Sequence, residues 1–77
     1  MNNRLLIDNS KLDKILISKG MNKAMLANAA GITSNYLYRI TGGYRSPSNV
    51  VAKKIADVLD VDVLDIFFEK DVSKSIT

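Results

Sequence analysis

The chain has 77 residues and a net charge of +3, and it contains neither cysteine nor histidine. This length suits one small domain, so we expect a single domain over residues 1–77 with one modest core. Without cysteine there is no disulfide framework, and without histidine the commonest metal ligand and the commonest general base are missing. No apolar run approaches the roughly 20 residues that a membrane-spanning helix needs, which predicts no membrane span.

The charge is distributed unevenly along the chain. Residues 10–55 contain eight lysine and arginine residues against one acid, Asp13, whereas residues 56–77 contain six acids and two lysines. A basic body with an acidic end is typical of a protein that approaches a polyanion in one orientation. Two ordinary solvated faces would give the same pattern, so charge alone leaves both interpretations open.

A short helix-start signal recurs along the chain: an apolar residue, a capping residue, and a second apolar residue four positions after the cap. This is the spacing of an N-cap with its hydrophobic staple. It occurs with the caps Asp8, Asn22, Thr33 and Asp62, and a fifth cap, Ser48, follows a proline. Glycines at positions 20, 31 and 42–43 follow the periodic runs and are typical of helix ends.

Five short helices are therefore predicted, over residues 8–19, 23–30, 34–41, 49–59 and 63–67. Their inward residues recur at helical spacing. These residues are Leu12, Ile15, Leu16, Leu26, Ala27, Ala30, Leu37, Ile40, Val51, Ile55, Ala56 and Leu59. The predicted fold class is all-α, a compact bundle of five short helices, with residues 1–7 and 70–77 as extended or flexible ends.

Two short apolar segments lie at opposite ends of the chain, NRLLID at residues 3–8 and IFFEK at residues 66–70. Each could form a strand, and the two could pair with each other or with the same segments of a second chain. The simpler interpretation is that both only close the bottom of the core. We favour the simpler interpretation.

The helices over residues 23–30 and 34–41 are predicted to form a helix-turn-helix within residues 22–41. Ala27 and Ala30 make the inner side of the first helix small, so the second can cross it closely. Gly31 stands at the corner, where a residue beyond a helix end often needs a positive φ. In a helix-turn-helix, the second helix lies in the major groove of DNA.

The second helix of this motif has an unusual polar face. With Leu37 and Ile40 directed inward, the opposite face carries Ser34, Asn35, Tyr38 and Arg39. Asparagine pairs with adenine and arginine with guanine, both through two hydrogen bonds, and serine bonds to several base edges. A merely solvated helix usually favours glutamate and lysine, and this helix has neither. We therefore predict that the face reads DNA bases.

The segment GMNKAMLANAAGITSNYLYRITGGYRSPSNVVAKKIADVLDVDVLDIF resembles the lambda repressor-like helix-turn-helix domain of the Cro and Xre type. The resemblance covers roughly residues 10–67. The matching pieces are Leu26-Ala27, Gly31-Ile32-Thr33, Leu37, Ile40, Gly43, Arg45-Ser46-Pro47-Ser48 and the final IADVLDVDVLDIF. The resemblance implies a five-helix bundle that binds operator DNA, commonly as a two-fold dimer, in the bacterial cytoplasm or encoded by a phage.

The resemblance also implies which residues contact DNA. It places Ser34, Asn35, Tyr38 and Arg39 on the base-reading positions. It places phosphate contacts at Lys23, Thr33, Tyr36, Gly43, Tyr44, Arg45 and Ser46. This chain departs from the family pattern at Lys23, where glutamine is usual, and at Thr41-Gly42, where Glu-Asn is frequent. Tyr36 is larger than the usual residue and either touches DNA or packs sideways.

The remaining signals argue against catalysis. Asp57, Asp60, Asp62 and Asp65 fall within nine positions, but the glycine and the closing glutamate of a calcium loop are missing. Asp62 is better explained as a helix cap, with Asp65 as its first-turn partner. No glycine-rich phosphate loop or nucleophile motif is present. We predict no metal, no cofactor and no enzymatic activity.

The C-terminal region supplies more apolar residues than one small core needs, namely Phe67, Phe68, Val72 and Ile76. Phe67 is expected to close the core, which leaves Phe68 as the centre of a homodimer interface. The sequence thus predicts a sequence-specific DNA-binding transcriptional regulator, a repressor on a two-fold symmetric operator in double-stranded DNA. The alternative is a helix-turn-helix module used mainly for protein–protein interaction, as an antitoxin or accessory factor.

Overall fold

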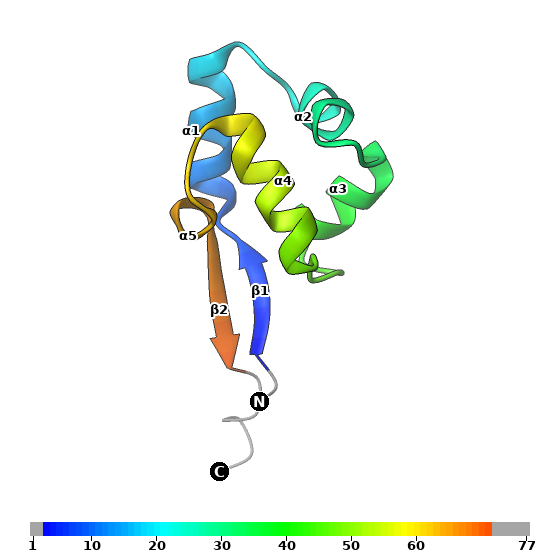
Figure 1. The fold of residues 1–77 in the computed structure, drawn as a ribbon, viewed down its shortest axis with the longest axis vertical. Helices are drawn as coiled ribbons and strands as arrows, with labels where there is room; N and C mark the ends of the chain where they lie inside the picture. The colour runs from blue at the N-terminus through cyan, green and yellow to red at the C-terminus, as the bar shows by residue number, and fades with distance from the viewer. Residues whose placement is uncertain (1–2, 72–77) are drawn as a thin grey trace.

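The computed structural model describes residues 3–71, in which five helices and two strands follow one another (Figure 1). The order is β1 (Asn3–Ile7), α1 (Asn9–Lys19), α2 (Lys23–Ala30), α3 (Ser34–Thr41), α4 (Asn49–Leu59), α5 (Val63–Ile66) and β2 (Phe67–Asp71). The predicted bundle of five short helices is confirmed. Of the predicted extended or flexible ends, residues 1–2 and 72–77 lie outside the described residues.

The helices begin and end where capping chemistry predicts. Asp8, Asn22, Thr33 and Ser48 each accept a hydrogen bond from the backbone N–H three residues later, over 2.8–3.2 Å. Gly20 ends α1 in the left-handed conformation, with φ of 66°. A glycine adopts this conformation without steric cost, so these ends are set by local sequence.

The core lies between the inward faces of the helices and one end of the strand pair. Its buried residues are Ile7, Leu12, Leu16, Leu26, Ala27, Ala30, Leu37, Ile40, Ala52, Ile55, Ala56, Leu59, Ile66 and Phe67. No polar or charged residue of the described part is buried. Burial of these side chains supplies the main force that holds α2, α3 and α4 together.

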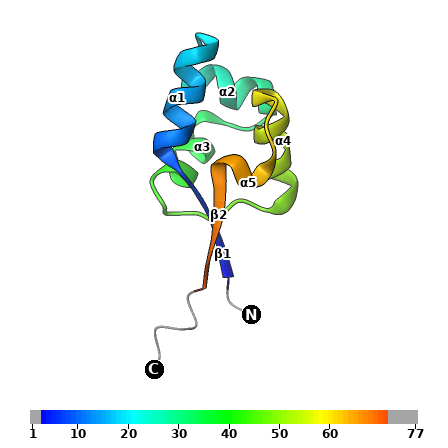
Figure 2. The same cartoon turned by 90° about the vertical axis from the view of Figure 1, so that its left-hand side faces the viewer.

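The favoured interpretation of the two terminal segments is wrong, because they form strands that pair with each other. β1 and β2 are antiparallel, and Ile7 lies opposite Phe67 while Leu6 lies opposite Phe68. Side chains alternate between the faces of a strand, so Ile7 and Phe67 enter the core and Leu6 and Phe68 lie on the other face. The ribbon of two strands extends away from the helices at one end of the molecule (Figure 2).

Asp60 ends α4 in a conformation that strains a residue with a Cβ atom. Its φ is 59° and its ψ is 44°, and it is the only described residue other than glycine with a positive φ. A left-handed conformation costs an ordinary L-residue roughly 1–2 kcal/mol, and somewhat less for Asp. The carboxylate also lies at the negative end of the helix dipole. Asp60 is therefore a site where substitution should stabilise the protein.

We expect Asp60→Gly to raise the free energy of unfolding by about 1 kcal/mol, as measured by urea denaturation. Asp60→Ala removes the same charge but keeps the Cβ atom, so it should gain less than the glycine variant. Equal stability of the two variants would show that backbone strain at this position is not the cause.

Candidate nucleic-acid interface

Helix α3 separates a buried side from an exposed polar side. Thr33 caps its N-terminus, where the Oγ1 atom accepts the N–H of Tyr36 over 3.0 Å. Leu37 and Ile40 are buried, and they fix the rotation of the helix on the core. The predicted base-reading residues Ser34, Asn35, Tyr38 and Arg39 are all exposed. The helix thus presents to solvent the face that the sequence predicts.

Helix α2 approaches α3 closely because its inner side is small. Ala27 and Ala30 are buried there, and Gly31 ends α2 with φ of 74°. The N–H of Ile32 donates to the carbonyl of Ala27 over 3.0 Å, which fixes the turn before Thr33. Two short helices joined by a three-residue turn have helix-turn-helix geometry, and α3 occupies the position of the second helix.

Lys23 is the first residue of α2, and its side chain reaches over to α3. The Nζ atom lies 5.8 Å from the centre of the Tyr38 ring. This distance allows a cation–π contact, which positions both side chains at the edge of the exposed face. Here lysine and tyrosine link the two helices at a position where the family pattern has glutamine.

If Lys23 contacts phosphate as predicted, we expect Lys23→Ala to weaken binding to every DNA duplex by a similar factor, because a phosphate contact does not depend on the base sequence. The dependence of log K on log salt should become shallower by about 0.9. Fluorescence anisotropy titrations on several duplexes at several salt concentrations measure both quantities. Lys70→Ala, which removes one positive charge from β2, is the control. Weakening confined to one sequence would contradict the phosphate role.

Tyr36 packs sideways rather than standing clear of the protein. Its ring is half-buried against the core, and the guanidinium of Arg45 lies 5.0 Å from its centre. This contact joins α3 to the loop that follows it. The stacking holds the Arg45 charge near the N-terminal half of α3, where a phosphate would lie if α3 entered a major groove.

The loop over residues 42–48 is fastened to the end of α3. The N–H groups of Tyr44 and Arg45 both donate to the carbonyl of Arg39, over 2.9 and 3.1 Å. Gly43 has φ of 81°, a value that suits glycine. Tyr44 is 81% exposed and Arg45 is also exposed. Tyr44 lies against Gly42 and Arg45 against Tyr36, so both side chains stand beside α3, and their contact with phosphate stays a prediction.

Ser46 has a role that the sequence does not suggest. Its hydroxyl accepts the N–H of Leu5 and donates to the carbonyl of Leu5, both over 3.0 Å. The side chain therefore occupies the free edge of β1, so any phosphate contact at Ser46 would have to come from its backbone. Arg4 also binds the loop, at the carbonyl of Gly43, and Asn9 binds the last residue of α3, at the carbonyl of Thr41. No local pattern marks these contacts, because they join residues more than 30 positions apart.

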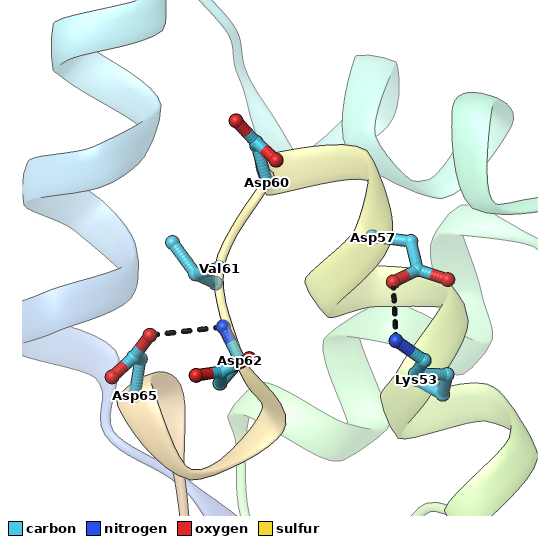
Figure 3. Close-up of a pocket in the computed structure, with 6 residues that line it drawn as sticks. All are labelled: Lys53, Asp57, Asp60, Val61, Asp62 and Asp65. Carbon is cyan, nitrogen blue, oxygen red and sulfur yellow. Dashed lines mark hydrogen bonds and ion pairs between the residues drawn. The ribbon is translucent and has the colours of Figure 1, made fainter.

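The four acids Asp57, Asp60, Asp62 and Asp65 lie along α4, α5 and the turn between them (Figure 3). Two of them, Asp57 and Asp65, bind groups of the protein itself. Lys53 binds the carboxylate of Asp57 over 2.8 Å, and this hydrogen bond and the charge of Asp57 raise the pKa of Lys53 above its ordinary value. The carboxylate of Asp65 accepts the N–H of Asp62 over 2.9 Å. Within residues 3–71, no group of three or more acidic, cysteine or histidine side chains is arranged to hold a metal ion.

The described helices are also too short or too polar to cross a bilayer.

The comparison with protein families decides what this arrangement is. The model of the helix-turn-helix family HTH_3 matches residues 12–66. The chain belongs to this family. The match begins within α1 and ends with α5, so it includes the exposed face of α3, the turn at Gly31 and the loop over residues 42–48, and it leaves out β1 and β2.

Two solved structures share this fold and about a quarter of its sequence. The restriction-modification controller protein C.AhdI from Aeromonas hydrophila is 27% identical with a TM-score of 0.65, over 73% of this chain and 85% of that one. The transcriptional regulator VanUg is 27% identical with a TM-score of 0.68, over 87% of this chain and 88% of that one. No sequence among curated proteins matches the chain. The family is one of DNA-binding regulators and not of enzymes, and the two neighbours are named as a controller protein and a transcriptional regulator.

Proposed function

We propose that this protein is a sequence-specific transcriptional repressor that binds DNA as a dimer and reads the major groove with α3. DNA-binding transcriptional regulation follows from its family and its two solved neighbours. The observation that supports base reading is the composition of the exposed face of α3. Asn35 and Arg39 stand there one helical turn apart, opposite the buried Leu37 and Ile40.

The proposed base contacts follow from the chemistry of these side chains. The amide of Asn35 matches the N6 and N7 atoms of adenine, and the guanidinium of Arg39 matches the O6 and N7 atoms of guanine. Tyr38 offers an apolar ring to a thymine methyl group. Ser34 lies in the first turn of α3, close to where the helix would enter the groove, and its hydroxyl serves either a base edge or a phosphate.

The proposed phosphate contacts frame this helix. Lys23 lies on one side, at the start of α2, and the side chains of Tyr44 and Arg45 lie on the other. The backbone N–H groups of Tyr44 and Arg45 already bind Arg39, so the contacts of these two residues are made by their side chains. Thr33, Tyr36, Gly43 and Ser46 complete the predicted set. Such contacts position a protein on DNA without reading its sequence.

We place the dimer interface on the outer face of the two-stranded ribbon. Phe68 is 46% exposed there, directly opposite Leu6 on β1. An aromatic residue next to a second apolar residue on an exposed face is a suitable centre for an interface. Val72 and Ile76, the other apolar residues of the C-terminal region, lie outside the described residues. A two-fold dimer would place two copies of α3 on half-sites one helical turn apart.

The proposed repression, in the cytoplasm of a bacterial cell, is tested with a reporter gene. Its promoter overlaps a DNA sequence that the protein binds in vitro. We expect the protein to lower transcription of the reporter and the Arg39→Ala variant to leave it nearly unchanged. Increased transcription of the reporter would contradict repression at that site. Unchanged transcription would also contradict it, provided that the protein binds the duplex in vitro.

A further inference from the structure

The N-terminal strand holds the loop that follows α3. Arg4 donates from its Nη2 atom to the carbonyl of Gly43 over 3.3 Å, and the backbone of Leu5 forms two hydrogen bonds with the hydroxyl of Ser46. Asn9, at the start of α1, donates to the carbonyl of Thr41 over 2.8 Å. Residues 4–9 lie outside the part of the chain that matches the family, yet they bind the end of α3 and the loop after it, which lie inside that part.

The charge of Arg4 is not needed to hold the loop. Its bond to Gly43 is exposed and long, so it contributes little to stability. A guanidinium carries five N–H donors, and this bond uses one of them. The only ion pair among the described side chains joins Lys53 to Asp57, so no described carboxylate neutralises Arg4.

Two basic residues are placed near Arg4, whereas Glu69, the neighbour of Lys70 on β2, lies opposite Leu5 and belongs to the other face of the strand pair. Lys70 is its direct partner across the strand pair, and like charges at such positions repel each other. Arg45 follows two residues after the carbonyl that Arg4 binds. This repulsion is relieved when a polyanion lies alongside.

We propose that Arg4 contacts a DNA phosphate, held at the phosphate-binding loop by strand β1. This inference rests on the proposed DNA binding of α3 and extends the interface to a strand outside the family match. The contact is independent of sequence, since it is made to the backbone of the duplex. Arg4 joins Tyr44 and Arg45 on one side of α3, opposite Lys23.

The test compares Arg4→Ala with two matched variants on a duplex of mixed sequence, by anisotropy titration at several salt concentrations. Lys70→Ala removes the same charge from the neighbouring strand. That strand lies on the far side of β1 from the loop, because Ser46 occupies the opposite edge. Asn9→Ala removes a bond to the last residue of α3, directly before the loop, without any change of charge.

We expect Arg4→Ala to bind more weakly than the wild-type protein, with a slope of log K against log salt that is shallower by about 0.9. Lys70→Ala and Asn9→Ala should keep the wild-type slope, and Arg4→Lys should restore most of it. Thermal unfolding shows whether each variant is folded, and Arg4→Gln replaces the alanine variant if that one is not.

Three results would overturn the proposal. An unchanged slope in Arg4→Ala would mean that Arg4 touches no phosphate. An equal change in Lys70→Ala would assign the effect to overall charge. An equal change in Asn9→Ala would assign it to the position of the end of α3 and of the loop that follows it. Failure of the wild-type protein to bind any duplex would instead contradict the proposed function, so the two failures are distinguishable.

Discussion

Replacing Arg39 with alanine is expected to weaken binding to the best DNA site by about 1–3 kcal/mol, or roughly fivefold to 150-fold. The guanidinium is exposed on the face of α3, where it offers two donors to a guanine. The carbonyl of Arg39 also holds the N–H groups of Tyr44 and Arg45, but alanine keeps this carbonyl. The loop should therefore stay in place, and the loss should report on the side chain alone.

The measurement is a set of affinities for duplexes in which each base pair of the site is varied in turn. The Arg39→Ala variant should lose its preference at one base pair and keep it at the others. Arg45→Ala removes an equal charge from the loop and should weaken all duplexes alike. Uniform weakening by Arg39→Ala would show that Arg39 contacts phosphate and does not read a base.

Replacing Phe68 with serine is expected to raise the dissociation constant of the dimer by at least roughly 30-fold, which corresponds to about 2 kcal/mol. Phe68 and Leu6 are the apolar pair on the outer face of the strand ribbon, and the aromatic ring supplies most of the area. A dimer binds both half-sites of a two-fold site at once, whereas a monomer binds only one of them. Loss of the dimer should therefore lower the affinity for a complete two-fold site by a factor of about 10² or more. Affinity for a single half-site should not change.

Sedimentation equilibrium of the protein without DNA measures the dimer directly. Ile17→Ser is the matched control, since Ile17 is 78% exposed on α1 and far more accessible than Phe68. It removes a similar apolar side chain from a surface outside the ribbon and should leave the dimer intact. A wild-type protein that is monomeric at high micromolar concentration, or equal effects of the two variants, would place the interface elsewhere.

The sequence predicts the helices well because each is specified locally. A capping residue and its staple lie within five positions of each other, and the glycines at 20 and 31 adopt the left-handed conformation that ends a helix. The boundaries of α2, α3 and α4 agree with the prediction, and α1 differs by the capping residue Asp8 alone. The fifth helix ends one residue earlier than predicted, because Phe67 begins β2. Most of the buried helical residues follow from the same helical spacing, but Ile15 and Val51 are only partly buried and Ala52 is buried although it is not among the predicted residues.

The strand pair was harder to predict because its two members are about 60 positions apart. Five residues with two or three apolar side chains are equally compatible with a strand and with an irregular segment that covers the core. Only the pairing of Ile7 with Phe67 and of Leu6 with Phe68 separates these possibilities, and this pairing is not encoded in either segment alone.

The candidate site likewise has one part that local sequence specifies and one part that depends on tertiary contacts. The exposed face of α3 follows from the inward positions of Leu37 and Ile40. Helical spacing alone therefore places Asn35, Tyr38 and Arg39 on that exposed face. The contacts that position the surrounding side chains are tertiary. Neither the approach of Lys23 to Tyr38 nor the bonds of Ser46 to Leu5 leaves a signal in the local sequence.

Selection of bound duplexes from a random pool, at near-physiological salt, tests the central claim that α3 reads DNA sequence. We predict enrichment of a two-fold symmetric motif whose half-sites lie about one helical turn apart and contain adenine and guanine positions that fit Asn35 and Arg39. Enrichment of one half-site alone would keep the reading helix and contradict the dimer. Salt-sensitive binding without any enriched sequence would contradict the claim and favour the alternative of a protein-interaction module.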